Sequence, residues 1–149
     1  ETPVPTDAQP TPDVTETPEP TPEQPAGTVI GSGAFDSETG VGLNTHTVWT
    51  AAEQPDGSVK LTLSVYVRSY TMEIGRRAIG ISVNGVEASG MTRSFSVNSP
   101  NAQTDTLIYS YATTVEKGSV TINVDWNYTG QYSGQELDVI SSSTIIPIS

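Results

Sequence analysis

The chain contains no cysteine, one histidine and only six Lys or Arg residues among its 149. Without cysteine it can form no disulfide framework, no thiolate-ligated zinc site and no thiol nucleophile. A single histidine, His46, excludes a histidine pair for zinc and gives no support for a Ser-His-Asp triad. We therefore expect no cofactor, and we expect that the protein is not an enzyme.

Positive charge is scarce, and the formal net charge is −11. Six of the 17 acids lie in residues 1–27, which hold no base. Residues 28–149 hold the other 11 acids and all six bases, so their net charge is about −5, an ordinary solubilising charge. Because no basic stripe forms, we expect no binding of nucleic acid or anionic lipid. No apolar run approaches the ~18 residues of a transmembrane helix, so we expect no membrane insertion by this chain.

Residues 1–27 differ in composition from the rest of the chain. They hold eight of the 11 prolines, many of them in Thr-Pro pairs, together with acidic residues. Proline fixes φ and lacks an amide donor, so this composition favours a solvated polyproline II conformation over a packed core. We predict a disordered linker or stalk over residues 1–27, with a reach of roughly 80 Å. Its composition favours an interdomain linker, and a surface tether would be the same segment with an anchor attached. Residues 28–149 have the length of one domain.

From residue 28 onward, apolar and polar residues alternate between turn signals. The segment "SVKLTLSVYVRSY" (58–70) places five aliphatic residues on one face, which predicts a long half-buried strand. Further strands are expected in 44–54, 77–84, 91–98, 104–115, 119–128 and 137–148, whereas the glycine-rich "GTVIGSG" is interpreted as turns or bulges. This spacing predicts an antiparallel β-sandwich, immunoglobulin-like or jelly-roll-like, with seven to nine strands and no helix.

The segment "VTINVDWNYTGQYSG" (120–134) holds the densest run of aromatic residues. Trp126 and Tyr128 share the parity of the aliphatic residues before them, so we expect both to point into the core. Tyr132 follows an expected turn at Thr129-Gly130 and is free to face a ligand. The predicted core residues of this strand and of the 58–70 strand are Ile122, Val124, Trp126, Tyr128, Leu61, Leu63 and Val65.

Three segments together resemble a known module: "ISVNG" (81–85), "VEKGSVTINVDWNYTGQYSG" (115–134) and "ISSSTIIPI" (140–148). The chain from 28 to 149 is similar to β-sandwich modules of minor tail proteins from phages that infect Gram-positive bacteria, and of Firmicutes surface proteins. The resemblance implies an immunoglobulin-like or related sandwich, exposed outside a cell, that acts as a spacer or binding module. The Thr-Pro segment departs from a tail-fibre pattern and is closer to a bacterial cell-surface or lipoprotein linker.

A candidate binding surface lies on the polar parity of the 58–70 strand. Tyr66, Arg68 and Tyr70 alternate there, and two aromatic residues around an arginine are unusual on a face that contacts only water. Aromatic rings stack on the C–H surfaces of sugars, while amide and carboxylate groups bond the hydroxyls. Tyr66, Arg68, Tyr70 and Tyr132 are therefore the predicted ligand-binding residues. Cross-strand packing of tyrosines on an exposed sheet is the competing explanation.

Carboxylates offer two other chemistries. A glycosidase pair could come from Asp36, Glu38, Asp105, Asp125, Glu136 and Asp138, although their separation is not encoded in the sequence. The alternating Asn123, Asp125 and Asn127 begin like a calcium-binding EF-hand loop, but Tyr128 and Gly134 stand where that loop needs glycine and glutamate. A structural calcium ion could still bind at the loops near residues 36 and 136, but no sequence motif supports it.

These observations predict a secreted or surface-attached bacterial module without enzymatic activity, which serves adhesion, spacing or ligand binding at the cell envelope. Its partner would be a glycan or a cell-surface protein. One alternative is a carbohydrate-binding module of a glycan-degrading system. Another is a structural spacer repeat that binds nothing. The oligomeric state is not encoded in any pattern of the sequence.

Overall fold

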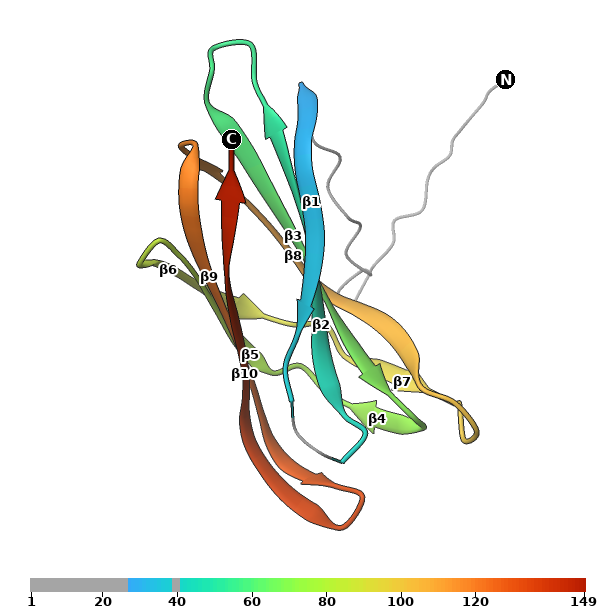
Figure 1. The fold of residues 1–149 in the computed structure, drawn as a ribbon. Coiled ribbons are helices and arrows are strands. Elements are labelled where there is room, and N and C mark those ends of the chain that lie inside the picture. The colour runs from blue at the N-terminus through green and yellow to red at the C-terminus, as the bar shows by residue number, and fades with distance from the viewer. Residues whose placement is uncertain (1–26, 39–40) are drawn as a thin grey trace, which may run out of the picture.

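A computed structural model describes residues 27–38 and 41–149, in which all the regular structure is β-strand (Figure 1). The ten strands are β1 (Thr28–Asp36), β2 (Asn44–Glu53), β3 (Val59–Ser69), β4 (Met72–Ile74), β5 (Ala78–Val83), β6 (Val86–Met91), β7 (Phe95–Val97), β8 (Thr104–Val115), β9 (Gly118–Tyr132) and β10 (Gln135–Ile148). The predicted stalk lies outside the described residues, except for Gly27.

Two four-stranded antiparallel sheets form the sandwich, in the orders β1-β2-β3-β8 and β10-β9-β5-β6 (Figure 1). The short strands β4 and β7 pair with each other in a third sheet of two strands. The prediction of an all-β antiparallel sandwich is confirmed. The eight strands of the sandwich fall within the expected seven to nine, and the three-residue strands β4 and β7 raise the total to ten.

The sandwich has two poles. At the first, Thr28 pairs with Glu53 and Ile148 pairs with Gly118, so both ends of the folded domain lie there. We call this the chain-end pole. At the opposite end, the distal pole, Arg68 pairs with Asp105 and the β9–β10 hairpin turns (Figure 1). The described residues that follow β1 and the loops after β3 and β7 also lie at the distal pole (Figure 1).

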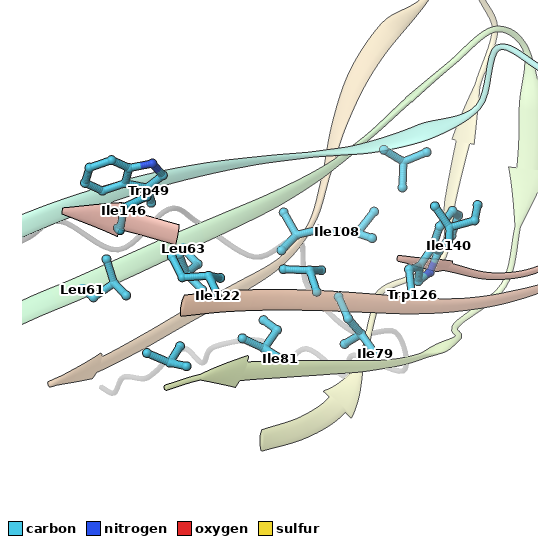
Figure 2. Close-up of a cluster of buried hydrophobic side chains, with 14 of the residues drawn as sticks. Trp49, Leu61, Leu63, Ile79, Ile81, Ile108, Ile122, Trp126, Ile140 and Ile146 are labelled. Atoms are coloured by element: carbon cyan, nitrogen blue, oxygen red, sulfur yellow. The ribbon is translucent and has the colours of Figure 1, made fainter. Parts of the chain in front are cut away.

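The core lies between the two sheets, as the close-up of the buried side chains shows (Figure 2). All seven residues expected in the core are buried: Leu61, Leu63, Val65, Ile122, Val124, Trp126 and Tyr128. Trp126 lies in register between Ile79 on β5 and Ile140 on β10. Its ring centroid is 5.3 Å from that of Tyr128. The two aromatic side chains therefore pack against each other in the core, on the side of the sheet that contains β9.

Three local expectations were wrong in whole or in part. The glycine-rich segment near the start of the domain was expected to form turns or bulges; it forms most of β1 instead of turns, and its register shift between Val29 and Gly31 is an irregularity of the bulge type. The expected strand over 91–98 is present only as the short β7, because residues 92–94 cross between the sheets and separate β6 from β7. Strand β9 continues through Gly130 to Tyr132, and the hairpin turns at Ser133 and Gly134, both with positive φ.

Candidate functional site

The four predicted binding residues separate into two groups. Tyr66 and Arg68 lie on the outer face of the sheet that contains β3, while Tyr70 and Tyr132 meet at the distal pole. The reason is that β3 ends at Ser69. The period of two that places residues 66 and 68 on one face stops before residue 70.

The outer-face group is a cross-strand set of polar side chains. The guanidinium of Arg68 donates from Nε and Nη2 to the two carboxylate oxygens of Asp105, at 2.8 and 3.2 Å. On the neighbouring strands, His46 Nδ1 lies 2.5 Å from Asp36 Oδ1, and the rings of His46 and Tyr66 are 6.3 Å apart between centroids. These side chains therefore hydrogen-bond or contact one another across β1, β2, β3 and β8. This arrangement favours a structural role for Tyr66 and Arg68.

The Arg68–Asp105 pair predicts a stability difference that depends on pH. The hydrogen bond from Arg68 lowers the pKa of the Asp105 carboxyl. A carboxyl whose pKa is lower in the folded state stabilises the fold above its unfolded pKa of about 3.9, and this stabilisation is lost as the pH falls through the folded pKa. We expect Arg68→Gln to cost at most about 0.5 kcal/mol at pH 6, because the pair is solvated. The cost should shrink as the pH falls below about 3.9 and vanish once the pH lies below the folded pKa of Asp105.

Thermal melts of the two proteins across this pH range measure the effect. The matched control is Arg76→Gln, because the Arg76 Nε donates to the Thr92 carbonyl rather than to a carboxylate. The control should show no pH-dependent difference from the original protein. A cost of Arg68→Gln that is the same at both ends of the range would contradict the assignment.

The second group lines a hollow of about 520 Å³ at the distal pole. Tyr70 is 41% exposed there, and Tyr132 is half-buried. The lining residues are Val41, Tyr70, Thr71, Met72, Glu73, Pro100, Tyr128, Gln131, Tyr132 and Ser133. They come from β9 of one sandwich sheet, from β4 of the two-stranded sheet and from the loops around them, so the hollow forms only when the β9–β10 hairpin lies against these segments.

A few contacts fix the walls of the distal hollow. The Tyr132 hydroxyl accepts a hydrogen bond from the backbone N–H of Tyr70 at 3.1 Å, which ties the β9–β10 hairpin to the end of β3. Gly42, with φ of +81°, lies against the ring of Tyr70, because a Cβ there would stand 3.2 Å from that ring. The side chain of Gln103 donates to the Gly42 carbonyl at 2.7 Å. The Tyr70 ring is thus held against the backbone while part of it stays exposed.

The distal hollow offers stacking surfaces and hydrogen-bonding groups. Glu73, Gln131 and Ser133 bring a carboxylate, an amide and a hydroxyl to its lining. The Tyr128 hydroxyl donates to the Gln131 carbonyl at 2.5 Å, and burial raises the pKa of this phenol, so it stays protonated at neutral pH. The lining therefore suits the binding of a neutral polar ligand and provides no activated nucleophile.

The remaining candidates lie apart from the distal hollow. Asp36 and Asp105, two of the possible glycosidase carboxylates, are occupied by His46 and Arg68. Asp125 lines a smaller hollow of about 280 Å³ on the outer face of β5, β6 and β9. Within residues 27–38 and 41–149, no three His, Asp or Glu side chains gather closely enough to hold a metal ion.

Sequence reasoning selected Tyr70 and Tyr132 but missed the rest of the lining. Val41, Met72 and Pro100 reach the hollow from loops and a three-residue strand, and such short segments carry no periodicity to indicate their direction. Further hollows lie beside β4 and β7, about 410 Å³, and between β6 and β8, about 550 Å³. Neither has an exposed aromatic ring in its lining.

Comparison with known proteins adds no further assignment. No protein-family model matches the chain, and neither does any curated protein or solved structure. The described part of the chain has no helix of the length and apolar character needed to cross a membrane.

Proposed function

We propose that the protein is a ligand-binding module of a bacterial cell envelope, without enzymatic activity, and that it binds through the distal hollow. The observation that carries the proposal is the meeting of Tyr70 and Tyr132 around this hollow, at the pole opposite Gly27 and Ser149. A domain connected through the chain-end pole presents this hollow outward. The extracellular location rests on the Thr-Pro composition of residues 1–27 and on the resemblance to surface modules.

The chemistry of the hollow favours a glycan as the ligand. The exposed Tyr70 ring can stack on the C–H face of a sugar, and the side chains of Gln131 and Ser133 can bond its hydroxyls. A volume of about 520 Å³ is that of a small-molecule site rather than of a protein interface. The same site would serve adhesion to a surface glycan or attachment to the substrate of a glycan-degrading system. A spacer that binds nothing is the rival function.

Substitution of Tyr70 tests the proposal. The full chain is applied to a glycan array and to affinity gels that contain cell-wall polysaccharides. We expect Tyr70→Ala to weaken binding at least about tenfold, because a central aromatic contact carries a large share of the binding energy. The matched control is Tyr66→Ala, since Tyr66 is also a tyrosine near the end of β3 but lies on the outer face. The control should bind like the original protein.

A second variant separates positioning from stacking. Tyr132→Phe keeps the ring and removes the hydroxyl that accepts from the Tyr70 N–H. It should weaken binding less than Tyr70→Ala does. A loss of binding in Tyr66→Ala with normal binding in Tyr70→Ala would move the site to the outer face. An absence of binding to every glycan would favour the spacer.

A further inference from the structure

The free edges of the two sheets differ in their protection. An edge strand presents unpaired N–H and C=O groups to which another strand can add, and proteins block such edges with bulges, prolines, charges or covering segments. Strands β1 and β10 each have a register shift, and β10 also carries Pro147. The edge of β8 is covered by Arg93, whose Nε donates to the Leu107 carbonyl at 3.0 Å.

Within the described part of the chain, strand β6 has only one of these devices, the charge of Glu87. It pairs with β5 without a register shift and contains no proline, lysine or arginine. Its sequence "VEASGM" exposes apolar side chains at both ends, with Val86 at 69% and Met91 at 48%. The β6 edge is therefore the one that a further strand can extend most readily.

The turn before β6 determines which backbone groups point away from β5. Asn84 and Gly85 have φ of 51° and 84°, the signature of a type I′ two-residue hairpin. In such a hairpin Val83 and Val86 form a hydrogen-bonded pair, and the bonded pairs alternate along the strand. The N–H and C=O groups of Glu87, Ser89 and Met91 therefore point away from β5, to the free side of the sheet.

We propose that β6 pairs antiparallel with β6 of a second copy of this chain, so that two sheets join across a twofold axis. In a continuous antiparallel sheet, the side chains of two directly opposite residues point to the same face of the sheet. Only residues of the same parity can therefore lie opposite each other, so the twofold axis passes at the position of a residue and not between two residues. An axis at Ala88 sets Glu87 opposite Ser89 of the second copy. An axis at Glu87 would oppose two like charges and is excluded.

The side chains of this register complement one another. Val86 faces Gly90 of the second copy, which has no side chain. Behind Gly90 lies the ring of Tyr109, since a Cβ at Gly90 would stand 2.3 Å from the Tyr109 hydroxyl and 2.9 Å from its ring carbon Cζ. The exposed Val86 of each copy is thus covered by a glycine and an aromatic ring of the other. This self-complementarity favours a second copy over an unrelated strand as the occupant.

The interface is small, because β6 has only six residues. It falls below the ~1,200 Å² of stable complexes, so the dimer should be weak and dependent on concentration. Copies that are tethered to one surface would experience effective concentrations of about millimolar order, at which such a contact forms. This inference does not depend on the distal hollow.

Ser89→Pro is the variant that tests the contact. Proline removes an N–H that points away from β5, and proline is tolerated on an edge strand at such a position. Sedimentation equilibrium of the full chain, from about 10 μM to about 1 mM, should show a reversible dimer for the original protein. Ser89→Pro should remain a monomer with an unchanged unfolding temperature, while the control Ser89→Ala, which keeps the N–H, should dimerise normally.

Two results would overturn the proposal. One is an original protein that stays monomeric at every concentration, which would leave the β6 edge to a strand of another protein or to none. The other is a Ser89→Pro variant that dimerises like the original. If Ser89→Pro unfolds at a lower temperature, Val86→Lys takes its place, because Val86 is exposed and its replacement does not disturb the core. A dimer that persists in Val86→Lys would equally refute the contact.

Discussion

Replacement of Trp126 by alanine is expected to lower the free energy of unfolding by about 3–5 kcal/mol. The side chain is completely buried, and its neighbours Ile79 and Ile140 are fixed in the sheet on either side of it. Removal of the indole leaves a cavity that these strands cannot fill without breaking their register. Because a domain of this size is stable by about 5–15 kcal/mol, the loss is a large share of the total. Equilibrium unfolding in urea measures it.

Trp126→Phe is the matched control for Trp126→Ala. The indole Nε1 of Trp126 has no hydrogen-bond partner among the described residues, and a buried unpaired donor costs about 1–3 kcal/mol. Phenylalanine retains most of the ring volume and removes that donor, so Trp126→Phe should lose less than half as much stability as Trp126→Ala. Unchanged unfolding of Trp126→Ala together with lost ligand binding would contradict the core role.

The second large effect is expected at Gly33, in the edge strand β1. A Cβ at this position would stand 2.8 Å from Nε1 of Trp49 and 3.0 Å from its ring carbon Cε2. The Trp49 ring is nearly buried and belongs to the core cluster, so its displacement would disturb the core side chains packed with it (Figure 2). We expect Gly33→Ala to destabilise the domain by about 1–3 kcal/mol, the usual cost of an overpacked site. Urea unfolding gives the stability, and near-UV circular dichroism reports the displacement of Trp49.

Gly80→Ala is the control for this substitution. Gly80 also lies in a strand, but a Cβ there would meet no atom within 4 Å. The control should therefore unfold like the original protein, or at slightly higher urea because alanine restricts the unfolded chain (about 0.4–1 kcal/mol). If Gly33→Ala and Gly80→Ala were equally stable, the packing of Trp49 against β1 would not be the reason for glycine at position 33.

The faces of the long half-buried strands could be predicted from the sequence. In β3 and β9 one face packs in the core and the other contacts solvent, so burial produces a period of two that the residues themselves reveal. Strand β6 is an edge strand whose inner face is formed by Val86, Ala88 and Gly90, which give only a weak apolar period, and the glycines of β1 leave room for the Trp49 ring on the neighbouring strand. Both strands were therefore missed or misread.

The distal hollow could be predicted only in part. Tyr70 and Tyr132 were both selected, but for separate reasons, and 62 positions separate the two residues whose hydrogen bond builds the site. Their contact depends on how the two sheets stack, which local periodicity does not encode. The prediction that Tyr66 and Tyr70 share one face fails at the end of β3, because side-chain alternation applies only while the strand continues.

The position of both domain ends at the chain-end pole affects how the protein carries tension. A force that pulls Gly27 and Ser149 apart loads the Thr28–Glu53 and Ile148–Gly118 pairings first and then peels β1 and β10 from their neighbours one pair at a time. Peeling breaks single hydrogen bonds of about 1 kcal/mol in sequence, whereas shear would load all of them together. Tension between the two domain ends would therefore unzip β1 and β10 at a lower force than a domain loaded in shear would resist.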